Sequence, residues 1–195
     1  MGNTQEDLTM DSQTLIWIGI AVVALVAIAA VAWSIYARRH SERLRNRFGP
    51  EYERALERHG NRRKAEADLA ERARRVEKLT LRPLTAEETE RFARSWKTVQ
   101  SHFVDNPTAA VSESNALIKE LMQARGYPVG DFEERAADLS VEHAEVVTHY
   151  RAARDIALGN EKGKATTEDL RQAVVHYRAL FQELLDQPVA VAQAS

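Results

Sequence analysis

The stretch LIWIGIAVVALVAIAAVAWSIYA, from Leu15 to Ala37, decides how this chain is organised. It contains no charged residue and is longer than the roughly 20 apolar residues that a helix needs to cross a bilayer. A helix at the surface of a soluble domain would instead carry polar residues along one face. Trp17 lies near one end and Trp33 and Tyr36 near the other, as in the aromatic belts of membrane proteins. We therefore predict a transmembrane helix at Leu15–Ala37.

The flanks of this stretch predict its orientation. Residues 1–14 form a short acidic tail without Lys or Arg, unlike the basic start of a cleaved signal peptide. Five arginines follow the stretch: Arg38, Arg39, Arg43, Arg45 and Arg47. Because positive residues beside a span stay in the cytoplasm, we expect a single-pass protein of the bacterial plasma membrane with its N-terminus outside. We expect the five arginines to contact anionic lipid headgroups.

Charge divides the rest of the chain into two parts. Residues 38–82 contain 15 Lys and Arg against 8 Asp and Glu, a balance of +7; residues 83–195 contain 12 against 18, a balance of -6. We predict a basic juxtamembrane helical region at 38–82, a helical domain at 83–187 and a flexible tail at 188–195. Arginines that alternate with glutamates beside a membrane favour lipid over nucleic acid as a partner, so we expect no nucleic-acid binding.

Helix start and stop signals recur after the membrane stretch. In the juxtamembrane region, Gly49-Pro50 precedes a first helix that ends at Gly60, a second helix runs from Arg62, and Pro83 lies in a linker. In the distal domain, a capping box of Thr85 with Glu88 opens the first long helix, and Asn106-Pro107 opens the second. A short helix follows at Phe132–Leu139. Ser140 opens the third long helix, and Thr166 or Thr167 caps the fourth.

No segment shows the period-two alternation of a strand. We therefore predict an all-α protein with one N-terminal transmembrane helix, charged juxtamembrane helices and a bundle of about four helices.

The last two long helices repeat the tetrapeptide His-Tyr-Arg-Ala, at His149–Ala152 and His176–Ala179. In both helices the spacing of apolar residues places the tyrosine on the buried face, the histidine one step away and the arginine further round toward water. A short loop joins the two helices and favours an antiparallel hairpin. The two repeats then lie level, with like residues opposite each other.

Two interpretations of the repeat remain open. The favoured one is packing, with Tyr150 and Tyr177 meeting across the hairpin. The alternative is a metal or acid–base site that uses both histidines, His149 and His176, beside those tyrosines. A catalytic zinc needs about three protein ligands, and the possible third ligands, His143 or Glu145, lie a turn or more away. We predict no catalytic residue, metal or cofactor elsewhere.

Several segments after the membrane stretch are similar to the landmarks of a family of uncharacterised bacterial membrane-anchored proteins. They are RFGPEYERAL, GNRRKAEADLAERARR, LRPLT, RGYP, FEERAADLSVEH and TEDLRQAVVHYRALFQELL, and they span roughly Arg43 to Leu185. The resemblance implies a bacterial origin and a shared helical domain. It supplies no activity and no catalytic residue.

These features predict a membrane-anchored cytoplasmic helical module for protein interaction or scaffolding, and not an enzyme. The alternative function is metal binding or catalysis at the repeated His-Tyr pairs. A homo-oligomer assembled through the span is a further possibility, because small residues that permit close helix contact form a stripe: Gly19, Ala27, Ala30 and Ser34.

Overall fold

The structure is a computed structural model that describes residues 12–186, and every regular element in this range is an α-helix. The prediction of an all-α protein is confirmed for these residues. The chain divides into two compact units, Met1–Arg43 and Leu44–Ser195. The predicted tails at 1–14 and 188–195 lie outside the described residues, apart from Ser12–Thr14, which begin the first helix.

Helix α1 (Ser12–Phe48) contains the predicted membrane stretch. Among the described residues, one helix is long and apolar enough to cross a membrane: the Trp17–Phe48 part of α1, whose most apolar window has a mean hydropathy of 2.6 and no buried residue. The large apolar side chains of this stretch are exposed, including Trp17 at 68% and Trp33 at 73%. Such a continuous apolar surface is rare on soluble proteins and marks contact with lipid or another protein.

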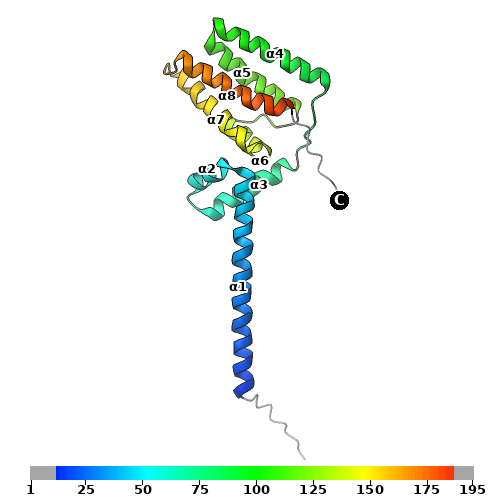
Figure 1. Ribbon diagram of the computed structural model, residues 1–195, viewed down its shortest axis with the longest axis vertical. Coiled ribbons are helices and arrows are strands. Elements are labelled where there is room, and N and C mark those ends of the chain that lie inside the picture. Colours follow the sequence, from blue (N-terminus) through cyan, green and yellow to red (C-terminus); the bar gives the residue numbers. More distant parts are fainter. Residues whose placement is uncertain (1–11, 187–195) are drawn as a thin grey trace, which may run out of the picture. The chain divides into compact units, whose positions relative to one another are not determined.

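The second unit contains the end of α1 and seven further helices (Figure 1). They are α2 (Pro50–His59), α3 (Arg62–Val76), α4 (Ala86–Asp105), α5 (Pro107–Ala124), α6 (Phe132–Glu142), α7 (Ala144–Glu161) and α8 (Thr167–Asp186). Helices α4, α5, α8 and α7 lie side by side in that spatial order, and α7 and α8 form the most extensive pair.

Two hydrophobic cores hold this unit together. The first lies among α4, α5, α7 and α8, where Trp96 stacks on Phe181 with ring centroids 4.7 Å apart. The second joins the end of α1 to α2 and α3 around Phe48. Helix α6 links the two, because Leu139 is buried in the first core and Val141 in the second. The unit is therefore not a free-standing bundle of four helices. The change in charge at residue 83 does not coincide with a boundary between compact units. That boundary lies between Arg43 and Leu44.

Most helix ends follow the sequence signals. Thr85 and Glu88 form the predicted capping box, and the Asn106 side chain accepts a hydrogen bond from the Ala109 N–H. Gly60 ends α2 in the left-handed conformation that glycine adopts most readily, with φ 59°. Thr166 rather than Thr167 caps α8, because its Oγ1 accepts a hydrogen bond from the Asp169 N–H at 3.2 Å.

The predicted start of the third long helix at Ser140 is wrong. Ser140 lies within α6, which extends to Glu142, and α7 begins at Ala144. The buried Ser140 hydroxyl donates to the Ala137 carbonyl at 2.6 Å, so it bonds to the preceding turn instead of capping a following one. The chain turns at His143, where φ is -129° and ψ is 44°.

The linker between α3 and α4 is held against the end of α5. The Arg82 N–H donates to the Arg125 carbonyl at 3.0 Å. A Cβ atom on Gly126, where φ is +93°, would lie 2.5 Å from the Thr80 carbonyl oxygen. Glycine is therefore required at 126 both by the backbone conformation and by the close approach of the linker.

Candidate functional site

The α7–α8 hairpin brings the two His-Tyr-Arg-Ala repeats together as predicted. The Nδ1 atoms of His149 and His176 are 2.9 Å apart. The rings of Tyr150 and Tyr177 meet edge to face, with centroids 6.2 Å apart. Like residues therefore lie opposite each other across the hairpin.

Both tyrosines belong to the core, as the packing interpretation predicts. Tyr150 and Tyr177 are fully buried, and burial raises the pKa of each phenol above its usual value. The Tyr150 hydroxyl accepts a hydrogen bond from Arg135 Nε at 3.0 Å. The Tyr177 hydroxyl has no hydrogen-bond partner within residues 12–186. Neither phenol is placed to meet a molecule arriving from solvent.

The two arginines of the repeats differ, and the prediction that both point toward water is wrong for Arg151. Arg178 is exposed, whereas the Arg151 side chain is only 4% exposed. Arg151 donates from Nε and Nη2 to the two carboxylate oxygens of Glu51, at 2.7 and 3.1 Å. Its Nη1 donates to both oxygens of Glu133, at 3.0 and 2.9 Å. These two carboxylates compensate the buried charge of Arg151.

The ion pairs of Arg151 extend into a network across four helices. Glu51 of α2 also lies 3.5 Å from Arg72 of α3, and Glu133 of α6 accepts from Arg58 at 2.9 Å. Burial by itself would lower the pKa of Arg151, but hydrogen bonds and charge from Glu51 and Glu133 outweigh it and raise that pKa. The network joins the helices predicted as juxtamembrane to the hairpin.

The two histidines of the repeats lie at the surface. His149 is exposed and His176 is partly buried. Partial burial, followed by the influence of His149, lowers the pKa of His176. No group of three or more His, Cys, Asp or Glu side chains is gathered for a metal in the described part of the chain. The two Nδ1 atoms face each other along the line between the ring centroids, which are 5.2 Å apart, so the rings are placed for a hydrogen bond with each other.

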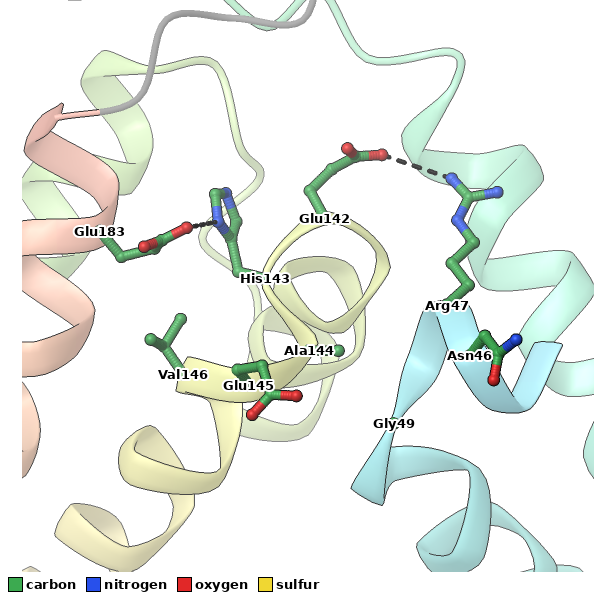
Figure 2. Close-up of a pocket in the computed structure, with 9 residues that line it drawn as sticks. All are labelled: Asn46, Arg47, Gly49, Glu142, His143, Ala144, Glu145, Val146 and Glu183. Carbon is green, nitrogen blue, oxygen red and sulfur yellow. Dashed lines mark hydrogen bonds and ion pairs between the residues drawn. The ribbon is translucent and has the colours of Figure 1, made fainter. Parts of the chain in front are cut away.

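A second polar site lies where α1 meets α2 and where α6 meets α7, and we call it the acidic groove (Figure 2). Its volume is about 320 Å³, in the range of small-ligand pockets. The residues that line it are Asn46, Arg47, Gly49, Glu142, His143, Ala144, Glu145, Val146 and Glu183.

His143 is the buried polar group of the acidic groove. Its side chain is 2% exposed; Nδ1 lies 3.1 Å from Glu183 Oε1, and Nε2 lies 3.4 Å from the Tyr127 hydroxyl. Figure 2 shows the imidazole turned toward Glu183 of α8 and Glu142 turned toward Arg47, while Glu145 belongs to neither pair. Burial lowers the pKa of His143 despite the nearby Glu183 carboxylate. Burial also raises the pKa of Tyr127 to about 12.

The groove lining carries a net negative charge and suits a cationic group. It contains three carboxylates, of Glu142, Glu145 and Glu183, and one guanidinium, of Arg47. Arg47 is 3.3 Å from Glu142, so this pair is internally neutralised. Sequence reasoning considered His143 and Glu145 only as further ligands for the hairpin histidines and missed the groove. No local pattern could have indicated it, because His143 and Glu183 are 40 residues apart.

The five arginines after the membrane stretch fall into two groups. Arg45 pairs with Glu53, and Arg47 pairs with Glu142. The other three are exposed and form no ion pair with any residue that the structure describes: Arg38, Arg39 and Arg43. Of the five, these three have guanidinium groups without a carboxylate partner among residues 12–186.

Comparisons of this chain with models of protein families, with curated proteins and with solved structures find no match.

Proposed function

We propose that this protein is a single-pass membrane-anchored helical module that holds a partner protein at the bacterial plasma membrane. One observation carries the proposal: α1 exposes an apolar surface on all sides, and a compact helical unit follows it in the chain. Leu15–Ala37 is the segment we assign to the bilayer. The arginines that follow support a cytoplasmic location for Leu44 onward, because basic flanks stay in the cytoplasm.

The side chains that resembled reactive groups in the sequence support an interaction module rather than an enzyme. The two repeat tyrosines are packed in the core, and Arg151 is saturated by carboxylates. These groups stabilise the unit and are not presented to a substrate. The domain that follows the anchor is in this reading a rigid platform for another protein.

We place the partner at the acidic groove. Its carboxylates favour a lysine or arginine side chain of the partner, and Glu145 is the exposed carboxylate of the lining that is free of the two pairs in Figure 2. A charge-assisted contact of this kind orients a partner and speeds encounter. The groove is formed by residues of the second unit, so it does not depend on how the anchor is oriented.

Capture of partners from native membranes tests this function. The Glu145→Arg variant should lose the proteins that crosslink to the parent chain, because it reverses the charge of the groove. The matched control is Glu87→Arg, since Glu87 is also exposed and also occupies the second position of a helix. Both variants lose the same favourable interaction with a helix N-terminus. Equal capture by the two variants would remove the groove from the proposal.

The orientation has its own test. A reporter fused after Ser195 should show cytoplasmic activity if the arginines retain the second unit inside. Alkaline phosphatase activity from that fusion would place the unit on the outer side and contradict the proposal. The parent chain with Arg38, Arg39 and Arg43 replaced by Glu should show a mixed or inverted orientation.

Contact with anionic lipid can be assigned to particular arginines. We expect spin-labelled anionic lipid to be enriched around the reconstituted chain, and added salt to reduce the enrichment as charges are screened over about 10 Å at 0.1 M. The Arg39→Gln/Arg43→Gln double variant should reduce this enrichment more than Arg45→Gln/Arg47→Gln, whose guanidinium groups already have carboxylate partners. Equal losses would argue against this assignment.

A further inference from the structure

The surface of α3 that faces away from the core carries exposed basic side chains. Leu69 and Val76 are buried in the second hydrophobic core. Arg63 and Arg74 are exposed, and they lie about 20° apart around the helix axis because about three turns separate them. We call four exposed residues at this surface the basic face of α3: Arg63, Lys64, Arg74 and Lys78.

The basic face differs from the other charged surfaces of the second unit in having no internal compensation. None of its four side chains forms an ion pair with a residue in the range 12–186. Several exposed arginines elsewhere do form such pairs: Arg58 with Glu133, Arg82 with Glu88, and Arg171 with Glu168. The exposed carboxylates beside the basic face are those of Glu71 and Glu77, so a positive excess of two charges remains.

Helix stability does not account for the basic residues at the start of α3. Helices α2, α4, α6, α7 and α8 each have at least one acidic residue in the first turn. Helix α3 has none there and instead carries Arg63 and Lys64. Positive charge at a helix N-terminus is unfavourable, because the backbone dipole already makes that end positive. An external anionic surface would compensate this cost.

The connection to the membrane segment keeps α3 within reach of lipid headgroups. The residues from Ala37, where the segment assigned to the bilayer ends, to Phe48 belong to α1. A helix rises about 1.5 Å per residue, so this stretch is about 16 Å long. Phe48 is buried in the same hydrophobic core as Leu69 of α3. A membrane that holds α1 therefore lies close to α3 whatever the angle between the two units.

We infer that the basic face of α3 docks on the anionic lipid headgroups of the membrane that α1 spans. The inference rests on the proposed anchor and adds a lipid contact distinct from Arg38, Arg39 and Arg43. Basic residues near an anionic bilayer are attracted to its surface potential. Because α1 already holds the chain there, the effective concentration of lipid is high and a small excess of charge is sufficient. Docking limits the orientations of the second unit relative to the bilayer.

Fluorescent labels on the reconstituted full chain test the docking. The sequence contains no cysteine, so a single label can be placed at exposed Ala67 of α3 or, as a matched control, at exposed Ala116 of α5. In phosphatidylglycerol vesicles that contain nitroxide-headgroup lipid, the label on Ala67→Cys should be quenched several-fold more than the label on Ala116→Cys. The excess should disappear in phosphatidylcholine vesicles, and also at about 1 M salt, where charges are screened over about 3 Å.

Charge removal separates the basic face from net charge. Arg63→Gln/Arg74→Gln, made in the Ala67→Cys chain, should lose the excess quenching. Lys97→Gln/Arg178→Gln removes the same charge from exposed residues of α4 and α8 that have no ion pair within the described chain, so it should keep the excess. Equal effects of the two double variants would overturn the inference.

The same vesicles distinguish failure of the docking from failure of the anchor. Release of the chain by alkaline carbonate would overturn the anchor and the docking together. A chain that resists carbonate but shows equal quenching at the two labels would overturn the docking alone. The inference would also be wrong if nucleic acid, and not anionic lipid, shields the label on Ala67→Cys from a water-soluble quencher.

Discussion

The two copies of His-Tyr-Arg-Ala share four residues, one helical register and one hairpin, yet their arginines and tyrosine hydroxyls have different environments. Arg151 is buried between Glu51 and Glu133, whereas Arg178 is exposed. The Tyr150 hydroxyl accepts a bond from Arg135, whereas the Tyr177 hydroxyl is buried without a partner in the described chain. Helical periodicity placed both tyrosines correctly. It did not determine what else approaches each helix.

The difference arises from helices distant in the sequence. Helices α2 and α6 both pack against α7, and Glu51 lies 100 residues before the arginine that it binds. Identical local sequence therefore gives the same secondary structure and the same buried face, while tertiary neighbours decide whether a charged side chain at the edge of that face is exposed or enclosed. Substitutions that are equivalent in sequence should have unequal effects.

The largest difference in stability is expected between variants that lack one or the other of the two arginines. Arg151→Ala should lower the free energy of unfolding by about 3–5 kcal/mol, because it leaves the buried Glu51 carboxylate without its principal partner. Arg178→Ala should change it by less than about 0.5 kcal/mol, as is usual for an exposed side chain. Chemical denaturation of the full chain in a mild detergent measures both. Similar losses in the two variants would show that the ion network does not stabilise the fold as described.

Removal of the two tyrosine hydroxyls should change the free energy of unfolding by smaller amounts, and the two changes should differ in sign. Tyr150→Phe leaves the buried Arg135 Nε–H without its acceptor and should destabilise the chain by about 1–3 kcal/mol. Tyr177→Phe removes a buried hydroxyl that has no partner among residues 12–186, so it should be neutral or slightly stabilising. The same denaturation experiment applies. A loss in Tyr177→Phe that matches Tyr150→Phe would reveal a hydrogen bond to Tyr177, for example from water.

These contrasts also show which parts of the structure the sequence could predict. Features that a few neighbouring residues specify were predicted correctly. They include the capping box of Thr85 with Glu88 and the end of α2 at Gly60. The pairing of the two repeats was also correct, because a short loop leaves one simple way to place two helices. The prediction of a helix start at Ser140 was wrong because a serine hydroxyl can either cap the next helix or bond to the turn before it.

The acidic groove and the ion network could not be predicted in this way. Each joins side chains from elements far apart in the chain, such as His143 with Glu183 or Arg151 with Glu51. Nothing in the residues around His143 distinguishes it from an exposed histidine. Its burial results from the turn between α6 and α7 and from the neighbouring α8.

Histidines inside and outside the repeat should contribute differently to the pH dependence of the free energy of unfolding. The pKa of His143 is lowered mainly by burial, and Glu183 offsets this only in part. The unfolded chain therefore takes up a proton near pH 6.5 that the folded chain still excludes, so stability falls as pH drops below that value. His143→Gln should reduce this loss between pH 7 and 5, and His176→Gln, at a less buried residue, should reduce it less. An unchanged pH profile in His143→Gln would contradict the assignment.

The smallest effects on the free energy of unfolding are expected at the paired histidines. His149→Ala and His176→Ala should each cost about 1 kcal/mol or less, because the pair lies at the surface and loses one hydrogen bond between the rings. The double variant should then cost less than the sum of the two single variants, since the first substitution already removes the contact that the second would break. The equivalent cycle for Arg151 and Arg178 should be additive, because Arg151 bonds to Glu51 and Glu133 and not to Arg178. Additive histidine costs would mean that the two imidazoles do not interact in solution, and the repeat would then pair through its tyrosines alone.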